Sequence, residues 1–303
     1  MTAPSTAHEI RDVNTRYHDG AAAGYDAKWG IDWGQIGATQ VLGKVRKALG
    51  GDLPAFPRSL EVGAGTGYFS LHLLQAGVVQ HATCTDISPG MISVLKGNAA
   101  RLGLDVTTQV TDAEELPFAD DSFDLVLGHA VLHHLPDLDR AFSEFRRVLR
   151  PGGAVVFAGE PSRHGDRIAN VPKRAAARLA PAWRTLMRAR PAAEGHSDGG
   201  AANHQLESQV DVHAFVPEDL ARVARDAGFA DVRVRGEELL ANWFGWANRA
   251  LEATADPETV PYGWKLYAYR GYIALQHVDR LALEPRLPPA LFYNLMVSAR
   301  APR

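Results

Sequence analysis

The stretch Leu60-Glu-Val-Gly-Ala-Gly-Thr-Gly-Tyr-Phe-Ser70 decides the fold. An apolar strand runs into three glycines at alternate positions, Gly63, Gly65 and Gly67, and a helix is expected to follow. Glycine lets the backbone turn sharply and approach a ligand closely, and the first turn of a helix presents unpaired N–H groups. The stretch therefore predicts a nucleotide-binding turn in an α/β fold.

The spacing of the glycines separates two kinds of nucleotide site. A dinucleotide-binding turn needs its third glycine where Tyr68 stands, so that the helix can pack closely against the strand. Tyr68 is too large for that position, which disfavours a nicotinamide cofactor. A tight strand-to-helix turn without a ligand stays open as the alternative.

Four further segments follow the glycine turn, at the predicted ends of strands or at the start of a helix. They are Asp86-Ile87 after a strand at 81–85, Asp112-Ala113 after a strand at 106–110, Gly128-His129 at the end of a strand at 121–129, and Leu132–Asp137, which is expected to open a helix. A carboxylate at a strand tip can accept both hydroxyls of a ribose, which makes Asp86 the ribose candidate.

Together, these segments resemble the class I S-adenosylmethionine-dependent methyltransferases of the type 11 subgroup, over roughly residues 55–160. The resemblance implies a doubly wound, Rossmann-like sheet of seven strands, one of them antiparallel. It also implies S-adenosylmethionine as the methyl donor and S-adenosylhomocysteine as its product. The residues that would hold this cofactor are Tyr25, Gly63, Ala64, Gly65, Gly67, Asp86, Ile87, Asp112, Ala113 and Gly128.

Histidines are the candidate catalytic residues. Methyl transfer by in-line displacement depends mainly on positioning, and an oxygen or carbon acceptor usually also has to lose a proton. His129, at the tip of a strand, and His133, at the start of the next helix, are the candidate bases. Packing or helix capping is the alternative role for His133 and His134.

The organisation along the chain departs from a minimal methyltransferase. The expected parts are an N-terminal helical lid at 1–52, a cofactor-binding core at 53–160, 216–236 and 290–303, and inserted helical caps at 161–215 and 237–289. Both insertions leave from the carboxyl ends of parallel strands, where such sheets bind ligands. They are therefore expected to wall the acceptor site.

The first insertion is basic. Pro172 and Pro181 are each expected to begin a short helix, and Pro191 to end the second one. Eight lysines and arginines stand against a single aspartate between residues 163 and 190. A solvated face, contact with an anionic membrane surface, and recognition of an anionic acceptor through Arg178 all stay open.

The second insertion is aromatic, with eight Trp, Tyr and Phe residues between 243 and 272. Most of them are expected to pack the cap. Because large ligand pockets are mainly apolar and aromatic, Trp243, Trp246, Tyr267 and Tyr269 are candidate contacts for a sizeable small-molecule or lipid-like acceptor.

Bulk properties are those of a globular chain of 303 residues with a net charge of −3 and 46% hydrophobic content. The first thirty residues hold no apolar run, and the single cysteine, Cys84, cannot form an internal disulfide, so a cytoplasmic protein is expected.

Histidines at 196, 204 and 213 and Asp211 are too irregularly spaced to predict a metal site. Basic and aromatic residues do not interleave as in a nucleic-acid platform. Oligomeric state is left open.

The alternative function is a protein that binds S-adenosylmethionine without transferring methyl, as a cyclase, an isomerase or a regulatory partner. Fold and cofactor site would look alike in both cases.

Overall fold

The computed structural model describes residues 6–192, 210 and 212–303. A run of Gly, Ser, Asp and Asn at 195–205 has no core-forming residues and predicts a flap, but it lies outside these residues. The metal candidates His196, His204 and Asp211 lie outside them as well. The chain divides into two compact units. Unit 1 comprises Met1–Glu160, Gly199–Val234 and Met296–Arg303, and unit 2 comprises Pro161–Asp198 and Arg235–Leu295.

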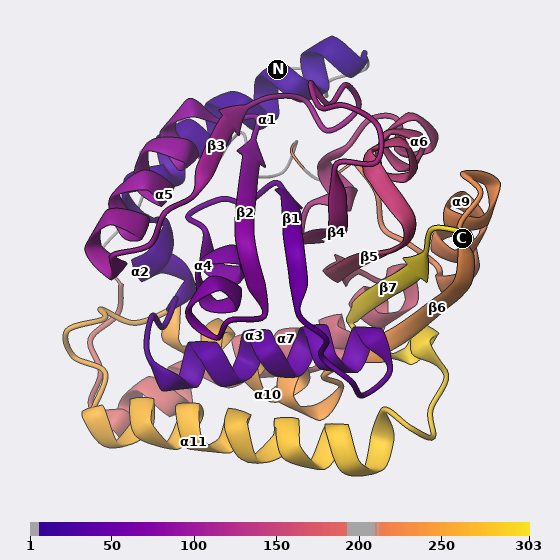
Figure 1. Cartoon of the computed structure of the whole chain (residues 1–303). Helices are drawn as coiled ribbons and strands as arrows, with labels where there is room; N and C mark the ends of the chain where they lie inside the picture. The colour runs from indigo at the N-terminus through magenta and orange to yellow at the C-terminus, as the bar shows by residue number, and fades with distance from the viewer. Residues whose placement is uncertain (1–5, 193–209, 211) are drawn as a thin grey trace. The chain divides into compact units, whose positions relative to one another are not determined.

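The described strands form one seven-stranded sheet in the order β3-β2-β1-β4-β5-β7-β6 (Figure 1). Their bounds are β1 Phe56–Val62, β2 Val79–Asp86, β3 Thr107–Val110, β4 Phe123–His129, β5 Leu149–Pro161, β6 Ala230–Glu237 and β7 Asn294–Arg300. Strands β3, β2, β1, β4 and β5 are parallel neighbours. The strand order reverses between β1 and β4, which makes the carboxyl ends of these two strands the place where ligands bind in doubly wound sheets.

Strand β7 runs against β5. The backbone of Ala301, directly after the end of β7, exchanges hydrogen bonds with Gly152 and Gly153 near the start of β5. Two neighbouring strands that meet end to start in this way are antiparallel. The predicted fold class, a doubly wound sheet with one antiparallel strand, is therefore confirmed.

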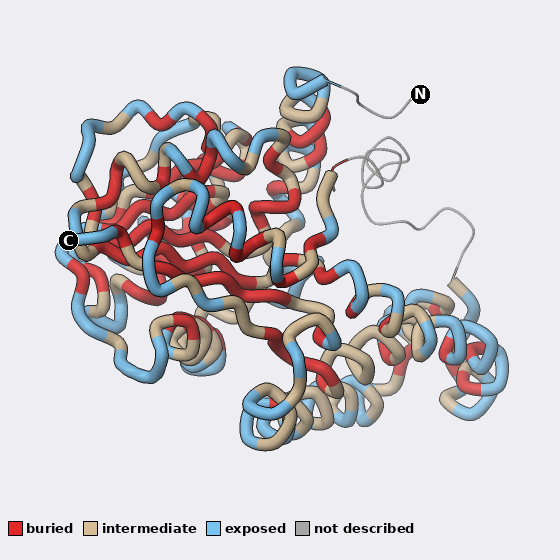
Figure 2. The backbone as a smooth tube through the Cα atoms, turned by 90° about the vertical axis from the view of Figure 1, so that its right-hand side faces the viewer, coloured by how far each residue is buried: buried red, intermediate tan, exposed pale blue. Residues whose placement is uncertain are grey.

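Helices cover both faces of the sheet in unit 1. They are α1 Ala7–Ala21, η1 Ala22–Gly24, α2 Tyr25–Trp29, α3 Gln35–Leu49, α4 Tyr68–Gln75, α5 Pro89–Leu102, α6 Leu138–Val148 and α9 Pro217–Asp226. Val45 of α3 and Leu73 of α4 share one buried cluster with Leu125 of β4. Phe145 of α6 packs against Phe157 of β5, with ring centroids 5.0 Å apart. Figure 2 shows how the buried residues concentrate in the strands between these layers.

The segment Leu132–Asp137 does not open a helix as the sequence predicted. Residues Leu132–His134 form a single 3-10 turn, η2, and α6 begins only after Asp137, whose side chain accepts the N–H of Arg140. Leu135 is extended because the residue before a proline, here Pro136, avoids the helical region. Asp137 then supplies a favourable helix N-cap.

Unit 2 consists of helices, described here by themselves: α7 Arg163–Met187, α10 Leu240–Glu252, α11 Tyr262–Val278, η3 Asp279–Leu283 and η4 Pro289–Leu291. Helix α10 packs against both α7 and α11. Its first turn is capped by buried Asp279, which accepts the N–H groups of Leu240 and Ala241. No described helix of the chain has the length and apolar character needed to cross a membrane.

Helix α7 corrects a second prediction, because Pro172 and Pro181 lie inside one continuous helix and do not begin two short ones. Its buried positions recur every three to seven residues across both prolines: Gly165, Ala169, Ala176, Ala180 and Trp183. Proline weakens a helix interior by removing one hydrogen bond and crowding the preceding turn. Packing of α7 against α10, and of Trp183 against Trp264 of α11, overrides that local preference.

Candidate functional site

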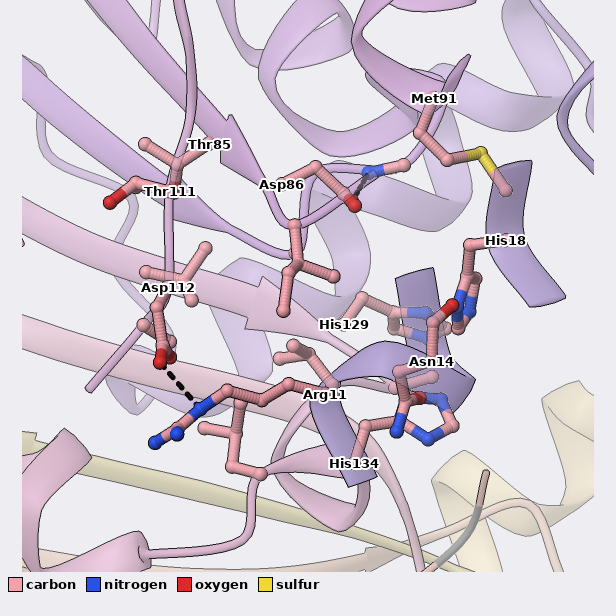
Figure 3. Close-up of a pocket in the computed structure, with 18 of the residues that line it drawn as sticks. Arg11, Asn14, His18, Thr85, Asp86, Met91, Thr111, Asp112, His129 and His134 are labelled. Atoms are coloured by element: carbon pink, nitrogen blue, oxygen red, sulfur yellow. Dashed lines mark hydrogen bonds and ion pairs between the residues drawn. The ribbon is translucent and has the colours of Figure 1, made fainter. Parts of the chain in front are cut away.

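A pocket in unit 1 lies at the carboxyl ends of β1, β2 and β4, beside helix α1 (Figure 3). It is lined by residues from five separate parts of the chain. They are Arg11, Asn14, His18, Tyr25, Val62, Gly63, Gly65, Thr85, Asp86, Ile87, Met91, Thr111, Asp112, Ala113, His129, Ala130, Val131, His134, Leu135 and Pro136. The pocket therefore occupies the point at which the strand order reverses.

The glycine turn forms one wall of this pocket. Gly63 has a φ of +61°, and a Cβ added to it would lie 2.3 Å from a methyl carbon of Val131. Only glycine fits there, because both the backbone conformation and the space exclude a side chain. Ala64 and Gly67 do not line the pocket. They shape the turn from behind, where Ala64 N–H donates to Thr85 (2.8 Å) and Gly67 N–H donates to Ala64 (2.8 Å).

Asp86 is held rigidly at the tip of β2. One carboxylate oxygen accepts the N–H of Gly65 at 2.8 Å, and the other accepts the N–H of Ser88 at 2.9 Å. Burial raises the pKa of Asp86, and the nearby His18 opposes that rise. Each carboxylate oxygen has a second lone pair, so the group can still accept two hydroxyl donors from a ligand.

The loop after β3 is tied to helix α1. Asp112 accepts the N–H of Glu114 with one oxygen (3.0 Å), and its other oxygen lies 2.6 Å from Arg11 Nε (Figure 3). Arg11 also pairs with buried Glu114. At the other end of α1, Asp19 accepts hydrogen bonds from Ser88 and from the N–H of Gly90. Helix α1 is thus joined to two of the loops that border the pocket.

Three pocket residues on α1, Arg11, Asn14 and His18, were missed by sequence reasoning. They stand at helical spacing, so they lie on one face of the helix. A polar face on an N-terminal helix usually predicts exposure to solvent. The spacing was visible in the sequence, but the docking of α1 onto the loops was not.

Tyr25 lines the pocket, as predicted for the lid. Burial raises its pKa to about 12, so the phenol keeps its proton near neutral pH and can both donate and accept a hydrogen bond. Tyr17, on the preceding helix α1, is not among the lining residues and is buried with Val13 and Val210.

Two of the lining histidines carry a fixed tautomer. Nδ1 of His134 lies 2.9 Å from the carbonyl oxygen of Val210, and Nδ1 of His18 lies 2.9 Å from that of Asn14. A carbonyl can only accept, so each Nδ1 carries the hydrogen and the lone pair of the neutral ring is on Nε2. Burial, together with the neighbouring His133 and His18, lowers the pKa of His134 well below 6.5. The two rings meet edge to face, with centroids 5.2 Å apart.

The candidate base His129 also lines the pocket. It stands at the end of β4, and its ring stacks on Phe69 at a centroid distance of 4.8 Å.

His133, the other candidate base, is not among the residues that line the pocket. It is buried, and its Nδ1 lies 2.8 Å from a carboxylate oxygen of Glu160. Glu160 also accepts the N–H groups of Val131 and Leu132. The rings of His133 and His134 lie against each other, with centroids 4.0 Å apart, but only His134 lines the pocket. His133 therefore fixes the turn that presents His134.

Gly128 is also outside the lining. A Cβ at this position would lie 2.6 Å from the ring of Phe157 and 2.7 Å from a methyl carbon of Val131. Gly128 is needed for close packing between β4 and β5, and it does not contact the pocket.

The five predicted acceptor contacts all belong to unit 2. Trp246 lies beneath Lys173 Nζ, 4.3 Å from its ring centroid, and Tyr267 packs edge to face on Phe244. Tyr269 and Arg178 are exposed, and Trp243 is partly buried. Their role in acceptor binding stays a prediction.

Among residues 6–192, 210 and 212–303, no group of three or more His, Cys, Asp or Glu side chains lies close enough together to hold a metal ion. Among the metal candidates, His213 is described, and its Nε2 lies 2.9 Å from the carbonyl oxygen of Leu135.

Comparison with known proteins supports the interpretation of the pocket. A family model described as a methyltransferase domain matches residues 60–157. Malonyl-[acyl-carrier protein] O-methyltransferase of Geobacter sulfurreducens is 36% identical over 148 residues, which cover 49% of this chain and 52% of the relative. The chain thus spans about half the length of the curated relatives it matches.

Two solved structures share the fold over almost the whole chain. Haemonchus contortus phosphoethanolamine N-methyltransferase 2, in complex with phosphomonomethylethanolamine and S-adenosylhomocysteine, superposes with a TM-score of 0.61 at 20% identity, covering 99% of this chain and 61% of that one. The [4+2]-cyclase SpnF superposes with a TM-score of 0.60 at 17% identity, covering 100% of this chain and 99% of the cyclase. Residues 60–157 thus match the methyltransferase domain of the type 11 subgroup, and this part of the chain is similar to class I S-adenosylmethionine-dependent methyltransferases.

Proposed function

We propose that the chain is an S-adenosylmethionine-dependent methyltransferase. The observation that supports this most is the convergence at one pocket of the glycine turn, the strand-tip carboxylate Asp86 and the Asp112-Ala113 loop. These groups are far apart in sequence and come together at the carboxyl ends of neighbouring parallel strands. Such convergence at the switch point of a doubly wound sheet is typical of a nucleotide site.

The residues present fit this cofactor. The bare backbone at Gly63 and Gly65 allows close approach, while Asp86 has lone pairs directed at the pocket for a ribose. Asp112 and Ala113 would hold the adenine edge, and Ile87 and Met91 would contact its faces. Tyr25 would close over the methionine end. When bound, the cofactor supplies an electrophilic methyl group on a sulfonium.

The proposed acceptor is a small-molecule or lipid-like metabolite that is methylated on oxygen or carbon. Such an acceptor has to lose a proton, and His134 presents a neutral imidazole with its lone pair on Nε2. His129 lies in the same lining and orients the acceptor beside it. The name of the Geobacter relative, an O-methyltransferase, is consistent with an oxygen acceptor.

Release of S-adenosylhomocysteine measured against a panel of phenols, β-dicarbonyl compounds and carboxylates tests the proposal. Turnover with at least one class of acceptor is expected. Tight binding of S-adenosylmethionine without product release from any acceptor would count against methyl transfer.

A second candidate is a cofactor-dependent cyclase or isomerase that transfers no methyl group. Its support is the shared fold over nearly the full length of a [4+2]-cyclase, which concerns architecture alone. The same panel separates the two functions when substrate conversion is followed beside release of S-adenosylhomocysteine. Conversion without release would favour the cyclase.

The Asp86→Ala variant is expected to bind S-adenosylhomocysteine about 10- to 150-fold more weakly, a loss of about 1.5–3 kcal/mol for a charge-assisted hydrogen bond to ribose. Calorimetric titration measures this Kd. Asp86→Asn is the matched control, because it keeps an acceptor oxygen but loses the charge, and an intermediate Kd is expected. Equal affinity in the wild type and the alanine variant would remove Asp86 from the site.

A further inference from the structure

Helix α7 carries an apolar stripe that no described part of the chain covers. Val171, Leu179 and Leu186 are 68%, 62% and 75% exposed, although all three are aliphatic. Ala175 and Ala182 fill the positions between them and are also exposed. At 100° per residue these five positions fall within one arc of the helix, about 22 Å long. The stripe exists only because α7 continues through Pro172 and Pro181.

The stripe is bordered by arginines. Arg167, Arg174 and Arg178 are exposed and lie on the arc next to it, on the side away from the face that packs on α10. Among the described residues, no carboxylate lies within ion-pair distance of these three guanidinium groups. The acidic residue of the helix, Asp166, is paired instead with Lys173. The exposed half of α7 is therefore apolar along one arc and positively charged along the next.

We propose that this half of α7 binds the surface of an anionic lipid membrane. An amphipathic helix with long aliphatic side chains beside arginines lies in the membrane interface, with its aliphatic groups among the acyl chains and its cations at the headgroups. The aliphatic side chains stand two turns apart on a convex helix. A fluid lipid layer accepts such isolated groups without a matching pocket, whereas a protein partner needs shape complementarity.

This surface belongs to unit 2 and uses none of the residues that line the pocket. The inference therefore does not depend on methyl transfer, and it can be tested without any acceptor. It would also place the enzyme where lipid-like molecules are concentrated.

Flotation of the full-length protein with vesicles tests the inference. Vesicles of phosphatidylcholine with about 30% phosphatidylglycerol are compared, at low salt, with vesicles of phosphatidylcholine alone. The comparison separates binding that depends on the negative charge of the lipid from binding through apolar contacts alone. Binding to the anionic vesicles is expected, with little binding to neutral ones. Added salt should weaken it, because the Debye length shortens.

The double variant Arg174→Gln with Arg178→Gln is expected to lower the partition coefficient about tenfold or more. Arg222→Gln with Arg225→Gln on α9 is the matched control, since both arginines are exposed in unit 1, and it should bind like the wild type.

Leu179→Ser with Leu186→Ser removes apolar contacts and should also weaken binding, whereas Ile36→Ser, at an exposed position of α3, should not. Circular dichroism and the Kd for S-adenosylhomocysteine check that each variant is folded.

Three results would overturn the inference. Wild-type protein that stays off anionic vesicles at low salt excludes the lipid surface. Equal partition coefficients for the α7 and α9 double variants would assign the binding to overall charge. Self-association, or capture of an acidic protein without vesicle binding, would assign the stripe to a protein partner.

Discussion

The His134→Gln variant is expected to lower kcat about 100-fold, the smaller end of the range for loss of a positioned general base. His134 lines the pocket, and its Nδ1–H is directed at the carbonyl oxygen of Val210, which places the lone pair of the neutral ring on Nε2. Glutamine can keep a hydrogen bond to that carbonyl but cannot take up a proton at neutral pH. The cofactor Kd should stay unchanged, since the side chain is assigned to the acceptor.

The dependence of kcat on pH provides a second measurement on the same enzyme. A general base works only when unprotonated, so kcat falls as the pH drops through its pKa. Burial lowers the pKa of His134 well below 6.5, and the fall in kcat should therefore lie well below pH 6.5. In the glutamine variant the residual kcat should lack this fall.

His129→Gln is the matched control for His134→Gln. His129 lines the same pocket but stacks on Phe69, so its replacement should raise the KM for the acceptor more than it lowers kcat. A kcat that is unaltered in His134→Gln would show that the acceptor attacks without prior loss of a proton to this residue. That result would leave methyl transfer itself intact.

The positions of the strands and of the glycine turn were predictable because they follow from local patterns. Buried parallel strands are continuous apolar runs, and their carboxyl ends must meet at one edge of the sheet. The order of strands and turns along the chain therefore predicts one pocket for Gly63, Asp86 and Asp112, and all three residues line it.

Other features depend on contacts that no local pattern reveals. Arg11 reaches Asp112 only because α1 docks across the loop after β3. Which of the two histidines, His133 or His134, lines the pocket depends on the orientation of a single 3-10 turn. The buried carboxylate of Glu160 fixes that turn. The continuity of α7 through Pro181 depends on its packing against α10, and the proline rule alone predicted a break.

A buried acid beneath the glycine turn should make the stability of the protein fall as the pH rises from mildly acidic to neutral. Glu61 lies in β1, is almost completely buried, and accepts the N–H of Ser70 at 2.9 Å. Burial raises its pKa from 4.5 to about 7, partly offset by the hydrogen bonds from Ser70. The folded protein therefore holds the proton more tightly than the unfolded chain. The resulting stabilisation is fully present below pH 4.5 and is lost as the pH rises through 7.

Between about pH 5 and pH 8.5, the free energy of unfolding of the wild type is expected to fall by roughly 2–3 kcal/mol through this one group. The Glu61→Gln variant should lose that dependence, because its amide stays neutral at every pH and its carbonyl oxygen can still accept the N–H of Ser70. Urea unfolding at several pH values measures the effect, with constant m-values as the check that the transition is comparable. Glu115→Gln is the matched control, since the Glu115 side chain is 81% exposed, and its free energy of unfolding should follow that of the wild type at every pH.

The same pH dependence of the free energy of unfolding in Glu61→Gln and the wild type would contradict the prediction. It would mean that Glu61 is already ionised in the folded protein near pH 5, with the Ser70 N–H and the N-terminus of helix α4 stabilising its charge.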